Sequence, residues 1–256
     1  MLDQRLATRV ENFVSRLKRE SVCMHGFILD VRGEVKATAY YPPFVEGKAH
    51  RMYSVSKSMT VLAIGLLLDE GKISLDDRIA DYFRDFLPEK PDARLMRLKI
   101  RDMLRMATCY RATVYRETDD DWTKPFFTAE PTHEPGTVFH YDTGCSQVLA
   151  ALVARLTGQQ VMDYLTARVF TPLGANDEKH WLCDPAGTCQ GGTGLCMSLR
   201  DLHKVTRLVM DGGRGILPEW FCREMTKKHI DNCLCANNLS GTSQPLWVVD
   251  GVPMQS

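Results

Sequence analysis

The amino-acid sequence predicts an α/β protein of the α+β type, in which an antiparallel sheet with flanking helices accompanies a mainly helical region. Two β-rich runs, residues 22–31 and 35–41, surround the turn candidate Arg32-Gly33 and predict an antiparallel hairpin. Most later apolar segments have helical spacing. Strands and helices do not alternate as they would in a doubly wound parallel sheet, so that class is disfavoured.

The predicted helices follow one another along the chain. Residues 2–17 have apolar side chains at helical spacing and predict an amphipathic helix before the hairpin. Residues 54–70 are dense in Met, Leu, Ala and Ile, and Gly71 supplies a C-cap. Residues 108–135 show little periodicity and predict an irregular segment. Further helices are expected at residues 79–83, 100–106, 147–156, 160–169, 198–210 and 219–227.

The composition is that of an ordinary globular protein, with 256 residues, 44% apolar content and a formal net charge of zero. Balanced charge gives no reason to expect nucleic acid or an anionic membrane as a partner. The N-terminal segment lacks a signal-peptide core, and the longest mainly apolar run, residues 59–68, is too short to span a bilayer. We therefore expect a cytoplasmic protein whose nine cysteines are reduced thiols.

A Ser-x-x-Lys pattern, from Ser54 to Lys57, opens the long apolar helix. Positions three apart lie on one face of a helix, so the lysine amine can reach the serine hydroxyl. Serine becomes an effective nucleophile when a base takes its proton, and a lysine among apolar neighbours loses its charge more readily. The helix N-terminus adds backbone N–H groups that can stabilise an oxyanion. The alternative is a helix cap at Ser54 followed by a solvated lysine.

Three stretches resemble motifs of the serine β-lactamase and penicillin-binding-protein-like family, in particular the branch with class C β-lactamases, D-alanyl-D-alanine peptidases and family VIII esterases. Residues 51–60, RMYSVSKSMT, resemble the family's nucleophile helix. Residues 134–144, EPGTVFHYDTG, resemble the second motif, Tyr-x-Asn or Tyr-Asn-[Ser/Thr]. Residues 191–195, GGTGL, resemble the Gly-Gly-x-Gly-Leu segment before a long helix. The stretches occur in the family's order, and the resemblance covers residues 22–227.

The resemblance implies a β-lactamase/transpeptidase-like fold and acyl transfer to Ser54. In that scheme Lys57 is the base, and Tyr141 relays protons between Lys57, Ser54 and the leaving group. Asp142 and Thr143 stand where the family carries its asparagine, so they are candidate substrate-binding residues without that amide. The resemblance implies no metal and no organic cofactor. The expected partner is a small-molecule ester, amide or peptide.

The family's third motif, Lys-Thr-Gly or His-x-Gly, has no clear counterpart. The nearest candidate, residues 239–242, lacks the basic residue. We therefore expect one β-lactamase-related domain over residues 1–256 that is incomplete at its C-terminus, so that open strand edges could support an oligomer. Its expected parts are a helix, hairpin and nucleophile in 1–60, a mainly helical region in 61–227 and a divergent tail in 228–256.

Two alternatives compete with the hydrolase hypothesis. The chain could be an inactive or truncated relative that binds a ligand or partner through the cleft in which the family's enzymes bind their substrates. The missing third motif and the altered second motif favour this alternative, whereas the retained serine, lysine and tyrosine favour the enzyme. A zinc site from Cys189, Cys196 and the Cys233-Leu-Cys235 segment is disfavoured because no Cys-x-x-Cys pair occurs.

Overall fold

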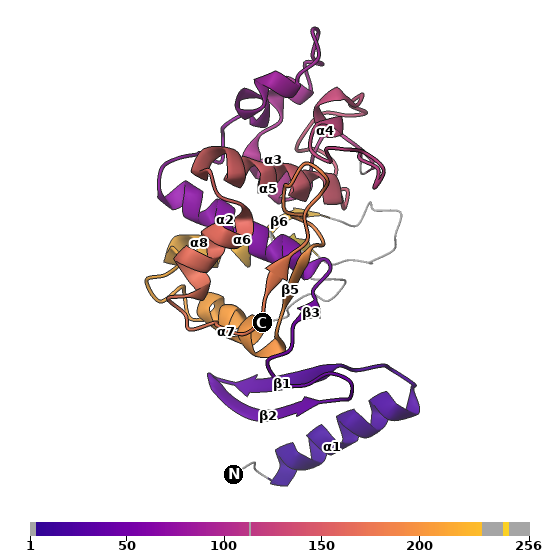
Figure 1. The fold of residues 1–256 in the computed structure, drawn as a ribbon, viewed down its shortest axis with the longest axis vertical. Helices are drawn as coiled ribbons and strands as arrows, with labels where there is room; N and C mark the ends of the chain where they lie inside the picture. Colours follow the sequence, from indigo (N-terminus) through magenta and orange to yellow (C-terminus); the bar gives the residue numbers. More distant parts are fainter. Residues whose placement is uncertain (1–3, 113, 232–242, 246–256) are drawn as a thin grey trace.

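The structure is a computed structural model that describes residues 4–112, 114–231 and 243–245. A mainly helical body occupies one end, and a hairpin with one helix occupies the other (Figure 1). The described α-helices are α1 (Gln4–Arg19), α2 (Val55–Asp69), α3 (Ile100–Leu104), α4 (Pro125–Thr128), α5 (Thr143–Thr157), α6 (Val161–Leu165), α7 (Leu199–Met210) and α8 (Glu219–Met225). The described strands are β1 (Gly26–Val31), β2 (Glu34–Tyr40), β3 (His50–Arg51), β4 (His180–Trp181), β5 (Leu195–Met197), β6 (Lys228–Asp231) and β7 (Ser243–Pro245).

The predicted hairpin forms from β1 and β2, which pair antiparallel and lie between α1 and α7 (Figure 1). Its two turn residues, Arg32 and Gly33, have φ angles of 55° and 86°. Positive φ at both central residues is the requirement of a type I′ turn, which matches the twist of the strands. On the α1 side, the Phe13 and Phe27 rings meet edge to face at 5.7 Å. On the α7 side, His203 Nε2 lies 2.9 Å from the Asp30 carboxylate.

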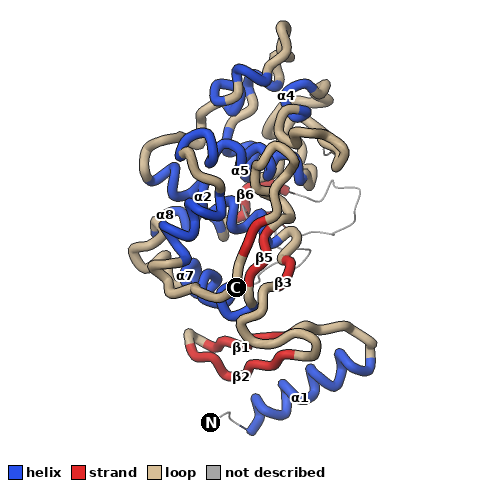
Figure 2. The backbone as a smooth tube through the Cα atoms, in the orientation of Figure 1, coloured by secondary structure: helices blue, strands red, loops and turns tan. Residues whose placement is uncertain are grey.

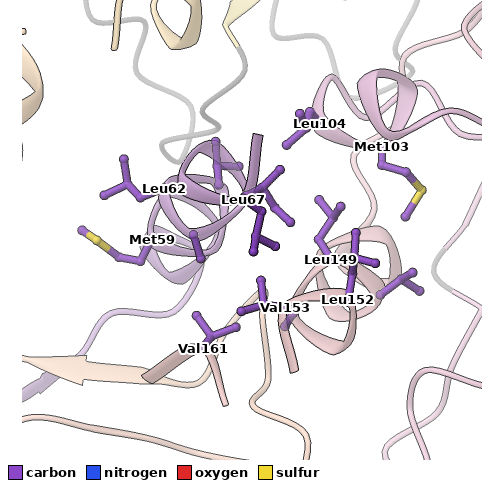
Figure 3. Packing of buried hydrophobic residues seen from close by; sticks show 14 of the residues in the cluster. Met59, Leu62, Leu67, Met103, Leu104, Leu149, Leu152, Val153 and Val161 are labelled. Carbon is purple, nitrogen blue, oxygen red and sulfur yellow. The ribbon is translucent and has the colours of Figure 1, made fainter. Parts of the chain in front are cut away.

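The core of the helical body is α2 packed against α5 (Figure 3). A helix that is apolar on every side must be surrounded by protein, and most of α2 is indeed buried. Gly65 permits a close contact between α2 and α8, because a Cβ there would lie 2.2 Å from the Phe221 ring of α8. This packing fixes the position of α2, and therefore of the residues at its N-terminus.

A second, three-stranded sheet with the order β3-β5-β4 lies between the hairpin and the helical body (Figure 2). The sequence did not predict it, since strands of two or three residues show no alternation of apolar and polar side chains. In the register, His50 pairs with Met197 and Arg51 pairs with Cys196. The sheet therefore joins the chain just before Ser54 to the chain just after the Gly191-Gly192 turn.

Several helices differ from the prediction in their boundaries or their type. The helix predicted at 147–156 begins earlier, at Thr143, because the Asp142 carboxylate caps it. The helix predicted at 79–83 is a 3₁₀ turn over Ile79–Tyr82, and a second 3₁₀ turn follows it over Arg84–Phe86. The helix predicted at 160–169 is α6 followed by a π-turn.

Towards the C-terminus, β6 pairs with β7. The third-motif candidate at residues 239–242 lies outside the described residues. In the described ranges, no helix combines the length and apolar content needed to cross a bilayer.

Candidate active site

Ser54 stands where β3 leads into α2. The backbone N–H of Met52 donates to the Leu195 carbonyl at 2.7 Å, so the small sheet holds the approach to the helix. Tyr53, directly before Ser54, has a φ of 45°, in the left-handed region that a non-glycine residue rarely adopts. Such strain persists where the surrounding structure enforces it, and it is concentrated at functional sites.

Lys57 is buried beneath Ser54, with only 2% of its surface exposed. Its Nζ donates to Ser54 Oγ at 3.3 Å and to the Gly192 carbonyl at 2.8 Å. In the part of the chain that the structure describes, the Ser54 side chain makes no capping hydrogen bond to α2. Both halves of the alternative interpretation, a capping serine and a solvated lysine, are therefore wrong.

Tyr141 comes from a distant part of the sequence and lies against Lys57, whose Nζ is 4.9 Å from the centre of the tyrosine ring. Tyr141 is half-buried and directly precedes the cap of α5. The structure thus brings together Ser54, Lys57 and Tyr141, the three residues predicted to carry the chemistry.

The other two candidates, Asp142 and Thr143, occupy different surroundings. Asp142 is fully buried, and its carboxylate accepts the Gly144 N–H at 2.7 Å. This contact fixes the start of α5. Thr143 is half-buried, and its methyl group faces Gly192, where a Cβ would lie 2.5 Å from Thr143 Cγ2. Of the two, Thr143 is the better placed to meet a substrate, and its contact with one stays a prediction.

The carbonyl groups of the Gly191-Gly192 turn were missed as functional groups, because the sequence suggested only an architectural role. The Gly191 carbonyl accepts the Thr60 hydroxyl at 2.8 Å, and the Gly192 carbonyl accepts Lys57 Nζ. A Cβ on Gly191 would lie 2.1 Å from the Ser146 carbonyl oxygen, so only glycine lets the turn lie this close to α5. In the sequence, the Gly191-Gly192 pair was the feature that could have indicated a close approach of the backbone to a neighbouring element.

A buried polar relay holds this turn in place. The Gln147 amide accepts the Gly191 N–H through Oε1 at 3.2 Å and donates through Nε2 to the Asp184 carboxylate at 3.1 Å. Asp184 also accepts the backbone N–H groups of Trp122 and Thr188. Burial raises the pKa of Asp184 despite these donors. These hydrogen bonds connect α5 and the 184–188 turn to Gly191, the residue directly before the Gly192 carbonyl that accepts the Lys57 amine.

Two weakly acidic side chains near Asp142, the Cys145 thiol and the Tyr115 phenol, stay protonated around pH 7. Burial raises the pKa of the Cys145 thiol far above its ordinary value, and the Asp142 charge adds to the effect. Burial also raises the pKa of Tyr115 to about 12, again with a contribution from Asp142. Neither group offers an anionic nucleophile that would compete with Ser54.

The zinc alternative finds no support in residues 4–112, 114–231 and 243–245, where no three His, Cys, Asp or Glu side chains gather as a metal site requires. Cys233 and Cys235 lie outside these ranges.

Comparison with known proteins identifies the family. A family model described as Beta-lactamase matches residues 27–231, so the chain belongs to the beta-lactamase family. The 6-aminohexanoate-dimer hydrolase of Paenarthrobacter ureafaciens is 27% identical to it in an alignment 225 residues long, and the match covers 81% of this chain and 57% of that protein.

Two solved structures extend the comparison to the fold. The octameric penicillin-binding protein homologue from Pyrococcus abyssi has a TM-score of 0.73 at 18% identity, covering 94% of this chain and 64% of its own. The D-amino acid amidase from Ochrobactrum anthropi has a TM-score of 0.68 at 18% identity, covering 88% of this chain and 75% of its own. The predicted fold class and family resemblance are therefore confirmed. The chain spans just over half the length of the hydrolase that it matches.

Proposed function

We propose that the protein is a serine hydrolase that cleaves an ester or amide through an acyl-enzyme on Ser54. One observation carries the proposal: the amine of Lys57, buried away from water, lies between Ser54 Oγ and the Gly192 carbonyl. A lysine that served only as a surface charge would remain in contact with water. A base, in contrast, must contact the hydroxyl whose proton it accepts.

In the proposed reaction Lys57 accepts the Ser54 proton while Oγ attacks the substrate carbonyl carbon. The Ser54 N–H at the start of α2 donates to the resulting oxyanion. Tyr141 passes a proton to the departing alcohol or amine, which leaves an ester on Ser54. Water then attacks this ester and its proton returns through the same groups, so the free enzyme and a carboxylic acid are formed.

Small esters, amides and peptides are the substrate class to test. Membership of the beta-lactamase family supports this class. The name of the 27% identical relative, a 6-aminohexanoate-dimer hydrolase, supports the inclusion of amides in the panel, because two amino-acid units are joined by an amide. A cytoplasmic location, the lack of nucleic-acid or membrane partners and an oligomer through an open sheet edge remain predictions.

Turnover of a panel of p-nitrophenyl esters and p-nitroanilide amides tests the proposal. We expect Ser54→Ala to lose all hydrolysis above background while keeping its circular-dichroism spectrum. Ser58→Ala is the matched control, since this buried serine lies on the same helix and its hydroxyl has no hydrogen-bond partner among the described residues. Unchanged turnover in Ser54→Ala would remove Ser54 from the mechanism. No turnover by folded wild-type protein would instead support the inactive, ligand-binding relative.

A further inference from the structure

The turn between β4 and the Gly191-Gly192 segment carries two cysteines that the proposed hydrolysis does not use. Cys183 and Cys189 face each other across an antiparallel bridge, with their sulfur atoms 3.9 Å apart. All the described cysteines are free thiols. The backbone explains why these two lie so close together.

The backbone around the pair has the geometry that a disulfide requires. The Asp184 N–H donates to Thr188, and the Gln190 N–H donates to Leu182, so the hydrogen bonds enclose the cysteines from both sides. This pattern makes the pair a non-hydrogen-bonded one, whose Cα atoms are typically about 4.5 Å apart. Disulfides accept Cα separations of about 4.4–6.8 Å. A bond can therefore form by rotation of the two side chains, without movement of the backbone.

The two thiols differ in access to solvent. Cys183 is exposed, whereas Cys189 has 2% of its surface exposed. A dissolved oxidant therefore meets Cys183 first, and Cys189 stands next to the sulfur that has reacted. An exposed thiol with a buried neighbour is the arrangement of an attacking and a resolving cysteine.

We propose that Cys183 and Cys189 form a thiol-modification site, in which Cys183 reacts with a small disulfide such as oxidised glutathione and Cys189 resolves the product into an internal disulfide. The site is independent of the hydrolase activity, since neither sulfur takes part in it.

The exchange proceeds in two balanced steps. The Cys183 thiolate attacks one sulfur of glutathione disulfide, a Cys183–glutathione bond forms, and one glutathione thiolate leaves. Cys189 then loses its proton to solvent and attacks the Cys183 sulfur, which expels the second glutathione thiolate. The protein loses two electrons as the internal disulfide forms, and the glutathione disulfide gains them as two thiols.

The surrounding contacts fix the backbone of the turn that carries the two thiols. The Cys189 N–H donates to the Gln160 side chain at 3.0 Å. The Asp184 carboxylate accepts the Thr188 N–H at 2.8 Å and belongs to the relay through Gln147. A disulfide between Cys183 and Cys189 would therefore cross-link the two sides of the turn that precedes Gly191.

Mass spectrometry of the full chain after incubation with a glutathione redox buffer tests the proposal. Burial raises the pKa of the Cys189 thiol to about 12, so the incubation is run at about pH 9, where more thiolate is present. On the peptides that carry Cys183 and Cys189 we expect the loss of two hydrogen atoms in mass and no retained glutathione, whereas the exposed Cys23 can hold glutathione independently of the pair. A protease that cleaves before aspartate separates Cys183 from Asp184, so the peptide ending at Cys183 stays joined to the one starting at Asp184 only through a disulfide.

Three variants complete the test. Cys196, on the same peptide as Cys189, is the matched control, and Cys196→Ser should retain the link. Cys189→Ser should lose the link and hold glutathione on Cys183, whereas Cys183→Ser should show neither. Stable glutathione on wild-type Cys183, a link that requires Cys196, or no reaction at Cys183 in folded protein would each overturn the proposal.

Discussion

Lys57 is the residue on which the proposed chemistry depends most. It lies at the bottom of the site, in contact with Ser54, with the Gly192 carbonyl and with the Tyr141 ring. A long charged side chain is rarely buried without a partner, because the loss of hydration is unfavourable. The hydroxyl, the carbonyl and the aromatic face together offset that loss and fix the amine where a base must be.

Replacing the lysine amine with an apolar group of similar length tests this role. We expect Lys57→Met to slow nucleophilic attack by Ser54 by about 10²–10⁴-fold, the usual contribution of a positioned base. The measurement is the rate at which a fluorophosphonate labels the protein. Lys72→Met, near the other end of the α2 segment and 43% exposed in its side chain, is the matched control and should label at the wild-type rate. Equal rates for the two variants would contradict the assignment of Lys57 as the base.

Gly192 is expected to tolerate no side chain. A Cβ there would lie 2.5 Å from Thr143 Cγ2 and 3.1 Å from Lys57 Nζ, so Gly192→Ala should displace the lysine and slow labelling by at least tenfold. The double variant Gly192→Ala/Thr143→Ser lacks the nearer methyl group, and it should recover part of the rate. Because the two residues touch, their effects should not add. Additive losses would show that the methyl contact is not what excludes a side chain.

At the scale of elements, the small sheet and the relay together bring the site to one place. The β3-β5 pairing aligns the approach to Ser54 with the end of the glycine turn, and Gln147 ties that turn to α5. Gln147 acts through Gly191 and touches no reacting atom, so it is a positioning residue.

Gln147→Met should separate positioning from simple stability. The methionine leaves the Gly191 N–H and the Asp184 carboxylate each without one partner, which costs about 1–3 kcal/mol per buried group. Urea unfolding measures that loss. We also expect slower fluorophosphonate labelling of the fraction that remains folded, because the Gly192 carbonyl shifts under Lys57. Gln159→Met, at an exposed site, is the control. A destabilised variant that labels at the wild-type rate would make Gln147 merely structural.

Long periodic elements could be predicted from the sequence, and short pairings could not. The patterns of α1, the hairpin, α2 and α7 extend over enough residues to be recognised locally. The strands β3, β4 and β5 exist only because distant segments pair, and a run of two or three residues carries no such information. The same division applies to the site. Helical spacing placed Ser54 beside Lys57, and the family resemblance added Tyr141, but no local pattern indicated that the Gly192 carbonyl receives the lysine.

At the scale of the whole molecule, ion pairs join segments that are distant in sequence. Asp177 connects the segment before β4 to α7, where its carboxylate accepts the Ser198 hydroxyl at 2.7 Å and Arg200 Nε at 3.0 Å. The Arg200 guanidinium lowers the pKa of Asp177 from its ordinary value of 3.8 to about 2. The folded protein therefore binds fewer protons than the unfolded chain between these two values.

This difference gives the sign of a pH effect. The contribution of Asp177 to stability is fully present above about pH 3.8 and is lost as the pH falls through about 2. We expect Asp177→Asn to lower the free energy of unfolding by about 1–2 kcal/mol at pH 7, allowing for the exposed arginine. In urea titrations the gap from wild type should shrink as the pH falls below 3.8. Asp81→Asn removes an exposed ion pair with Arg84 and should have little effect throughout. A gap that widens in acid would contradict the account.

The central claim is that Ser54 forms a covalent acyl-enzyme within this family fold, and the most direct test is intact-mass spectrometry after exposure to a fluorophosphonate. We predict a single adduct on the wild-type protein and no adduct on folded Ser54→Ala. An adduct that persists in the variant, or a folded wild-type protein that acquires none, would contradict the claim.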